Sequence, residues 1–132
     1  MELLVNIDVD ELERAIDFYT RAFDLKLDRR LFDNSVAELQ GAPSPIYLIL
    51  KPAGTTTSPS AIRDYRRHWT PIHLDFAVED LVAAVARAIA AGAKLERQTE
   101  SFPWGRQASF SDPFGHGFCL IEFTASGYNA AR

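Results

Sequence analysis

"LLVNIDVDELERAIDFYTRAFDLKLDRR", residues 3–30, and "IHLDFAVEDLVAAVARAIAAGAKLERQ", residues 72–98, repeat one pattern within a single chain. Residues 9–12 (VDEL) align without a gap with residues 78–81 (VEDL), and residues 26–29 (KLDR) align with residues 94–97 (KLER) once one residue is dropped. Each copy begins with alternating apolar and polar residues and then changes to a helical spacing. This repetition predicts two modules of the same structure.

The alternation in each copy indicates a strand with one apolar and one polar face. We expect a helix to cover the apolar face, which leaves the other face available for polar contacts. The first strand divides into Val5, Ile7 and Val9 against Leu4, Asn6 and Asp8, and the second into Leu74, Phe76 and Val78 against His73, Asp75 and Ala77.

The segment after each strand carries an apolar stripe at helical spacing. Gly92 follows the second stripe, where a glycine commonly ends a helix. The stripes consist of Leu12, Ala15, Ile16, Tyr19 and Phe23 in the first copy, and of Leu81, Ala84, Val85, Ala88 and Ile89 in the second.

Three strand-like runs follow each predicted helix, at 26–32, 36–40 and 46–51 and again at 94–98, 107–111 and 118–123. The chain therefore predicts a single α+β domain over residues 1–132, built from tandem βαβββ modules. We place module 1 at about 3–51, a linker rich in Pro, Gly, Ser and Thr at 52–71, module 2 at about 72–123 and a C-terminal tail at 124–132. Curved mixed sheets with helices outside and polar residues inside would enclose a cleft, a common location for small-molecule sites.

Composition excludes several classes of function. The 132 residues carry a net charge of −4, which argues against nucleic acid as a partner because phosphate binding needs a positive field. One cysteine permits no disulfide framework within the chain, and no apolar run is long enough for a membrane helix. We expect a cytoplasmic protein with no membrane partner. Dinucleotide-binding, phosphate-loop and serine-hydrolase motifs are also absent from the sequence.

Two stretches resemble the vicinal oxygen chelate superfamily, which includes glyoxalases, extradiol dioxygenases and bleomycin-resistance proteins. Residues 104–123, "WGRQASFSDPFGHGFCLIEF", are similar to the closing motif and last strand of that family. Residues 13–27, "ERAIDFYTRAFDLKL", are similar to its first helix and the following strand. The resemblance covers about residues 3–123 and implies the fold, a small-molecule ligand and a homodimer.

In metal-using relatives, four positions point into the cleft, and the resemblance places them on Leu4, Tyr47, His73 and Cys119. His73 matches a family histidine, whereas Cys119 stands where the enzymes carry a glutamate. Leucine offers no donor atom and neutral tyrosine is a poor ligand, while a catalytic zinc usually has three protein ligands. We therefore expect no standard metal centre. Glu122 lies near Cys119 in sequence, but the alternation puts it on the opposite face.

Three functions remain open at this stage. In the first, the protein binds a small molecule in a polar cleft without the family metal. In the second, a divalent metal held by His73 supports glyoxalase-like lyase or isomerase chemistry, or dioxygenase chemistry. In the third, His73 acts as an acid–base group with Asp75 or Cys119 and no metal. Candidate catalytic residues are His73, Asp75 and Asp8, and the expected cleft residues are Asn6, Asp8, Tyr47, His73, Asp75, Trp104 and Cys119.

Overall fold

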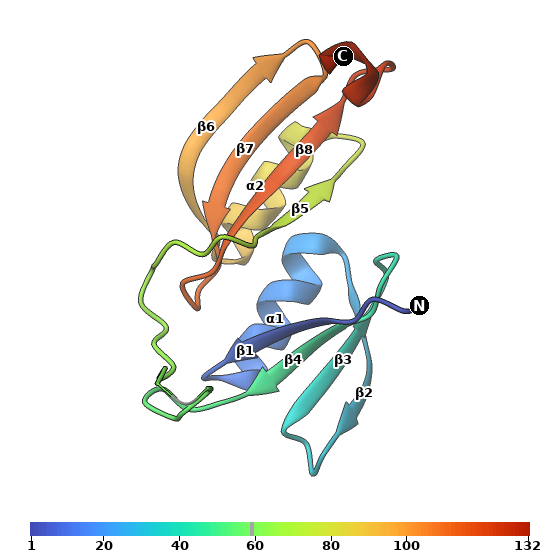
Figure 1. The fold of residues 1–132 in the computed structure, drawn as a ribbon. Helices are drawn as coiled ribbons and strands as arrows, with labels where there is room; N and C mark the ends of the chain where they lie inside the picture. Colours follow the sequence, from blue (N-terminus) through green and yellow to red (C-terminus); the bar gives the residue numbers. More distant parts are fainter. Residues whose placement is uncertain (59) are drawn as a thin grey trace. The chain divides into compact units, whose positions relative to one another are not determined.

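The computed structural model describes residues 1–58 and 60–132 and divides the chain into two compact units, residues 1–66 and 67–132. The boundary falls within the predicted linker, of which residue 59 lies outside the described residues. Each unit contains one four-stranded mixed sheet and one α-helix in the order βαβββ (Figure 1). The predicted α+β fold class is thereby confirmed.

In the first unit, β1 (Val5–Val9) is followed by α1 (Leu12–Phe23), β2 (Lys26–Leu31), β3 (Val36–Gln40) and β4 (Ile46–Leu50). The sheet order is β1-β4-β3-β2, with β1 and β4 parallel and the other pairs antiparallel. The apolar stripe of α1 covers one face of this sheet. The core of the unit includes Leu12, Ala15, Phe18, Tyr19 and Ala22 from the helix and Val9, Ala37, Leu39, Ile46 and Leu48 from the strands.

The second unit repeats this arrangement with β5 (Leu74–Ala77), α2 (Leu81–Ala91), β6 (Lys94–Phe102), β7 (Gly105–Ser111) and β8 (Gly117–Phe123). The sheet order β5-β8-β7-β6 matches that of the first unit, with a parallel β5–β8 pair. Strand β6 runs four residues beyond the predicted run, and β7 begins two residues earlier. A 3₁₀ helix (Gly127–Ala131) follows within the tail.

Local signals in the sequence set both ends of α2. The side chain of Asp80 accepts a hydrogen bond from the backbone N–H of Ala83 at 3.1 Å, and Gly92 ends the helix with φ of 117°. The predicted stripe is only partly buried, because Ile89 is 47% exposed while Leu81 is 1% exposed. At about 100° per residue, Ile89 lies about 80° round the helix from Leu81, at the margin of the packed face.

Strand register places polar residues in rows on the sheet faces that the helices leave open. In the first unit, Asn6 pairs with Tyr47, which in turn pairs with Glu38. In the second unit, Asp75 pairs with Cys119, which pairs with Ser109. Directly opposite residues on neighbouring strands share a face of the sheet, so each row forms a polar surface. Among the described residues, no helix combines the length and apolar character needed to cross a membrane.

Candidate functional site

A pocket of about 150 Å³ lies in the second unit. Its lining residues come from β6, β7 and β8 and from the segment that leads from residue 67 into β5. Its lining combines aromatic rings with short polar side chains, a composition typical of small-molecule sites. The lining residues are Arg67, Trp69, Thr70, His73, Glu96, Ser109, Phe110, Gly117, Phe118 and Cys119.

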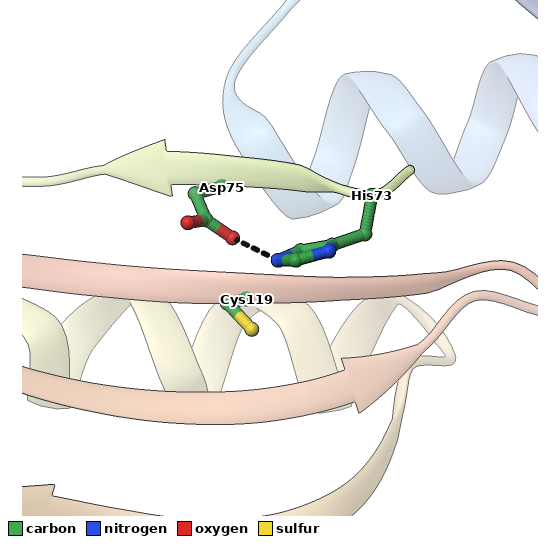
Figure 2. Close-up of side chains that lie close together, drawn as sticks. All are labelled: His73, Asp75 and Cys119. Carbon is green, nitrogen blue, oxygen red and sulfur yellow. Dashed lines mark ion pairs between the residues drawn. The ribbon is translucent and has the colours of Figure 1, made fainter. Parts of the chain in front are cut away.

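His73 and Cys119 of the pocket lining lie close to Asp75, and the three side chains form a cluster (Figure 2). The Nε2 of His73 is 3.1 Å from the Oδ1 of Asp75, and the donor atoms of all three side chains lie within 4.8 Å of one another. Parallel pairing of β5 with β8 sets Asp75 directly opposite Cys119, which explains this convergence. The structure thus brings together three of the seven expected cleft residues.

Cys119 is the most enclosed member of this group, with 8% of its surface exposed. Its Sγ lies 3.5 Å from both the Oγ of Ser109 and the Nε2 of Gln107. Burial raises the pKa of the Cys119 thiol above its ordinary value, an effect that the contact with Ser109 partly opposes. The protein therefore favours a neutral thiol at this position over a reactive thiolate.

The three donors are compatible with a zinc ion, because cysteine, histidine and aspartate are its usual ligands and catalytic zinc retains three protein ligands. Our prediction of no standard metal centre counted His73 and Cys119 as donors and did not count Asp75. The structure supplies that third donor, and the absence of a metal stays a prediction. Leu4, which precedes β1 and is 50% exposed, offers no donor atom.

Glu122 lies on the opposite face of β8 from Cys119, as the alternation predicts. Its Oε2 accepts a hydrogen bond from the backbone N–H of Leu81 at 2.7 Å, and its Oε1 lies 2.8 Å from Arg106. The hydrogen bond from Leu81, followed by the one from Arg106, holds the pKa of the Glu122 carboxyl below its ordinary value. Glu122 therefore acts as a cap for the N-terminus of α2.

In the first unit, Asp8 is paired with a residue of the linker. The Nε of Arg63 lies 2.7 Å from the Oδ2 of Asp8, and the Nη1 of Arg63 donates to the backbone carbonyl of Thr56 at 2.8 Å. Nearby, the hydroxyl of Tyr65 donates to the carbonyl of Lys51 at 2.6 Å, and burial raises the pKa of Tyr65 to about 12. These contacts hold Arg63 and Tyr65 of the linker against the first sheet.

Glu38 is a buried acid on the polar face of the first sheet that the sequence reasoning missed. It is 5% exposed and lies 2.5 Å from the Nε of Arg29, while Gln40 donates to its other oxygen at 2.9 Å. Register places it beside Tyr47, in the row that begins at Asn6. The sequence could have indicated this position, because Glu38 is the third residue of the VAELQ strand. Alternation places its side chain on the other face of the sheet from Ala37 and Leu39.

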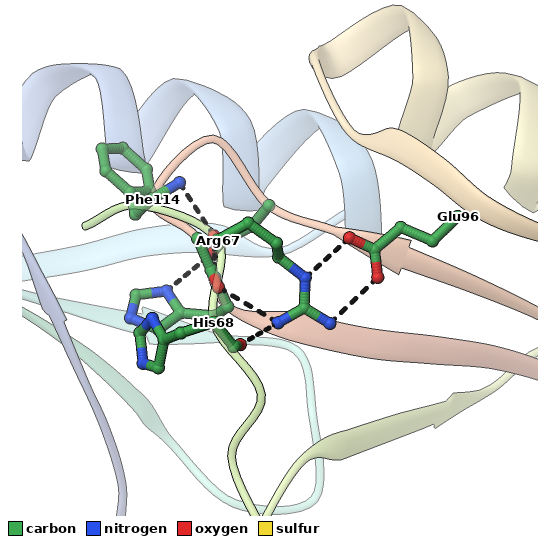
Figure 3. Close-up of polar contacts among 7 residues, drawn as sticks. Arg67, His68, Glu96 and Phe114 are labelled. Carbon is green, nitrogen blue, oxygen red and sulfur yellow. Dashed lines mark hydrogen bonds and ion pairs between the residues drawn. The ribbon is translucent and has the colours of Figure 1, made fainter. Parts of the chain in front are cut away.

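Arg67 is a second residue that sequence reasoning missed (Figure 3). Its Nε and Nη2 donate to the two carboxylate oxygens of Glu96 at 2.6 Å and 2.9 Å, in a bidentate pair. Hydrogen bonding to Arg67 is the main cause that lowers the pKa of the Glu96 carboxyl. The sequence showed only a short basic run here, because pairing between positions 67 and 96 leaves no periodic signal.

Trp104 belongs to an aromatic group at the turn between β6 and β7. Its ring stacks on Phe102 with a centroid distance of 4.9 Å and an interplanar angle of 3°, and it lies 5.4 Å from the ring of Tyr128. Phe123 completes the group at 6.3 Å. Trp104 does not line the pocket of the second unit, and its expected place in a ligand cleft stays a prediction.

The model of a glyoxalase-like domain matches residues 4–121, which is most of the chain. The chain belongs to this glyoxalase-like family. Its fold is that of the vicinal oxygen chelate superfamily, as the sequence resemblance predicted. The two βαβββ units are therefore this glyoxalase-like protein's version of a shared fold.

Several proteins are similar to this glyoxalase-like chain. The anthracycline biosynthesis protein DnrV of Streptomyces peucetius is 31% identical over 128 residues, covering 96% of this chain but 42% of DnrV. The chain thus spans less than half the length of that curated relative. Among solved structures, TioX from Micromonospora sp. ML1 has a TM-score of 0.72 at 20% identity, covering 94% of this chain and 99% of TioX. The antibiotic binding protein TnmS3 from Streptomyces sp. CB03234 has a TM-score of 0.66 at 24% identity, covering 94% and 96%.

Proposed function

We propose that this glyoxalase-like protein binds a small organic molecule through the pocket of its second unit and needs no metal for binding. The observation that carries the proposal is the pocket lining, in which Trp69 and buried phenylalanines stand beside Ser109 and His73. Apolar walls with a few directed polar groups are the general design of small-molecule sites. A relative named for anthracycline biosynthesis and a structural neighbour named for antibiotic binding support a natural product as ligand.

In this proposal the His73–Asp75 pair supplies hydrogen bonds to the ligand. In the neutral tautomer of His73 that carries the ring proton on Nε2, this N–H donates to Asp75. The Nδ1 of His73 is then a hydrogen-bond acceptor. The neutral thiol of Cys119 and the hydroxyl of Ser109 complete a set of weak donors and acceptors. Such a set orients a ligand without requiring a reaction.

A ligand panel with thermal denaturation tests the proposal. Anthracycline-type aromatic polyketides are added to the purified protein, and binding to the native state raises the melting temperature. We expect the rise to disappear in Trp69→Ala, which removes a pocket wall, and to persist in Trp104→Phe, which alters an aromatic outside the pocket. No rise with any ligand, or an equal rise in both variants, would contradict the proposal.

Metal-dependent lyase, isomerase or dioxygenase chemistry is the second candidate function. The observation in its favour is the convergence of His73, Asp75 and Cys119 within 4.8 Å. A divalent metal at these donors would polarise a substrate oxygen. The chain would contribute the ligands and the surrounding hydrogen bonds, while Ser109 would remain within reach of the Cys119 sulfur.

Metal analysis separates the two candidates. Protein purified without chelators or affinity-tag metal is analysed for bound divalent ions and titrated with Co²⁺, whose bond to a thiolate produces a charge-transfer absorption band. The first proposal expects substoichiometric metal. Near-stoichiometric metal that is lost in His73→Ala and Cys119→Ser, but retained in the His68→Ala control, would favour metal-dependent chemistry.

We also propose that the protein forms a homodimer, an expectation that rests on the family resemblance. Light scattering coupled to size-exclusion chromatography measures the mass directly. One 14.8 kDa chain gives the monomer value, and twice that mass is expected.

A further inference from the structure

The guanidinium of Arg67 uses nearly all of its hydrogen-bond donors within the protein. Its Nε and Nη2 donate to Glu96, while Nη1 donates to the carbonyls of Gly115, at 3.3 Å, and of His68. A guanidinium carries five N–H groups, so these four bonds leave one N–H unassigned. Arg67 is therefore equipped to hold its own segment in place and has little capacity left to bind an anion.

The backbone of β8 is shaped to receive this side chain. A Cβ at Gly117 would lie 2.6 Å from the Nη2 of Arg67, so the guanidinium occupies the volume that any larger residue at position 117 would fill. The segment 67–70, which we call the strap, is thus anchored to two strands, through Glu96 on β6 and Gly117 on β8.

The strap forms one wall of the pocket. Arg67, Trp69 and Thr70 all line it, and the Oγ1 of Thr70 donates to the carbonyl of Ile72 at 2.8 Å. The side chain of Trp69 is nevertheless 80% exposed. An indole at the mouth of a pocket offers a stacking surface for a planar ligand, which would cover apolar area that is now in water.

The charges that line the pocket are already paired within the protein. Glu96 is neutralised by Arg67, and His73 is paired with Asp75. An anionic ligand would have only one spare N–H of Arg67 to bind and would lie near the carboxylates of Glu96 and Asp75. A cationic ligand could pair with one of these carboxylates only by displacing Arg67 or His73. A charged ligand would therefore lose its hydration without gaining an adequate partner. An uncharged polar ligand loses much less hydration energy and can be satisfied by the polar groups of the pocket.

The volume of the pocket limits the size of the group that enters it. A cavity of about 150 Å³ corresponds to a benzene-sized group. We propose that the pocket takes one uncharged planar ring bearing hydroxyl or carbonyl groups, and that this ring stacks against the strap that Arg67 holds in place. The inference rests on the proposed function and specifies the ligand class and a positioning residue.

Three probes of similar size and different charge test the ligand class. Phenol, benzoate and benzylamine are titrated into the Trp104→Phe protein, in which Trp69 is the remaining tryptophan and reports on the strap directly. We expect phenol to change Trp69 emission saturably, with a dissociation constant on the order of 1 mM. Benzoate and benzylamine should bind at least about fivefold more weakly.

Two variants test the role of Arg67 in the same background. Arg67→Ala removes the side chain that anchors the strap. Gly117→Ala displaces the guanidinium without changing its charge. Both should weaken phenol binding about fivefold or more and lower the fluorescence anisotropy of Trp69, because the freed strap becomes mobile. Arg97→Ala is the matched control, because Arg97 is an exposed arginine of β6 that does not line the pocket.

The outcomes distinguish this inference from the proposed function. Benzoate binding that exceeds phenol binding and is lost in Arg67→Ala would show that Arg67 receives anions, and would overturn the inference. Phenol binding unchanged in both variants would overturn the role of the strap. If larger ligands raise the melting temperature through Trp69 while no ring probe binds, the inference fails and the proposed function stands. If neither binds, both fail.

Discussion

The Nε of Arg63 lies 2.7 Å from the Oδ2 of Asp8, an ion pair between residues 55 positions apart. The Arg63 side chain is only 16% exposed, so its charge depends on this partner and on the backbone carbonyl of Thr56. The position we expected to present a free carboxylate to a ligand instead anchors the chain that follows the first sheet.

Replacement of Asp8 should therefore destabilise the first unit. Asp8→Ala leaves a largely buried guanidinium without its carboxylate and should lower the free energy of unfolding by about 1–3 kcal/mol. Asp8→Asn retains an acceptor oxygen and should lower the free energy of unfolding by less than Asp8→Ala does. Urea denaturation measures both, with Asp17→Ala, in an exposed ion pair with Arg21, as a control expected to change stability by less than about 1 kcal/mol. Equal stability of Asp8→Ala and the unaltered protein would contradict this role.

Gly105 allows a close approach between the backbones of β7 and β8. Its φ is +157°, and a Cβ there would lie 2.3 Å from the carbonyl oxygen of Glu122 on β8. Gly105→Ala should separate β7 from β8 and lower the free energy of unfolding by about 2–4 kcal/mol. Gly54→Ala is the matched control, because Gly54 also has positive φ, +82°, but has open space around its Cβ position. Similar losses in the two variants would show that strain alone, without the steric clash, sets the cost.

Periodicity predicted much of this fold, because each unit buries one face of a helix on one face of a sheet. The alternation around Asn6 and Asp75 identified the open faces, and Gly92 marked the end of α2. Register was harder to predict. The sequence did not give the distances among His73, Asp75 and Cys119, whereas the parallel pairing with β8 sets Asp75 opposite Cys119 and 3.1 Å from the His73 ring.

Residues paired across long separations were missed for a physical reason. Local sequence patterns indicate which face of a strand or helix a side chain occupies. They do not indicate which residues distant in sequence the fold brings within ion-pair distance. Arg67 and Glu96 meet through such a return of the chain, as do Asp8 and Arg63. Alternation therefore indicated the strand face on which His73, Asp75 and Cys119 lie, but it gave no sign of the Arg67–Glu96 pair beside them.

The single cysteine provides a direct test of the pocket interior. Because burial raises the pKa of Cys119, the thiolate fraction near neutral pH is small, and alkylation should be slower than for a free thiol. The rate with iodoacetamide is measured from pH 7 to 10 against N-acetylcysteine and against the urea-unfolded protein. It should rise at higher pH than for the free thiol and fall when phenol fills the pocket. Faster alkylation of the folded protein at pH 7 would contradict a neutral, enclosed thiol.

Acid should release the strap through Glu96. Hydrogen bonding to Arg67 lowers the pKa of Glu96, so the folded protein binds a proton there less readily than the unfolded chain does. The stabilisation is therefore fully present above the ordinary pKa of a glutamate and is lost as pH falls through the lowered value in the folded state. In Trp104→Phe protein, the fluorescence anisotropy of Trp69 should be constant from pH 7 to about pH 5 and should fall below about pH 4.5, as the strap becomes mobile.

Glu96→Gln distinguishes the strap from general acid unfolding. Glutamine cannot form the charged bidentate pair, so the variant should show lower anisotropy of Trp69 emission already at pH 7 and little further change until the whole protein unfolds. Global unfolding is followed at each pH by circular dichroism. It has its own acid sensitivity, because Glu122 caps α2 and its pKa is also lowered. If the anisotropy and the helix signal of the unaltered protein fall together at every pH, the strap has no separate release. A fall in anisotropy first, with α2 intact, is the result that the paired geometry of Arg67 and Glu96 predicts.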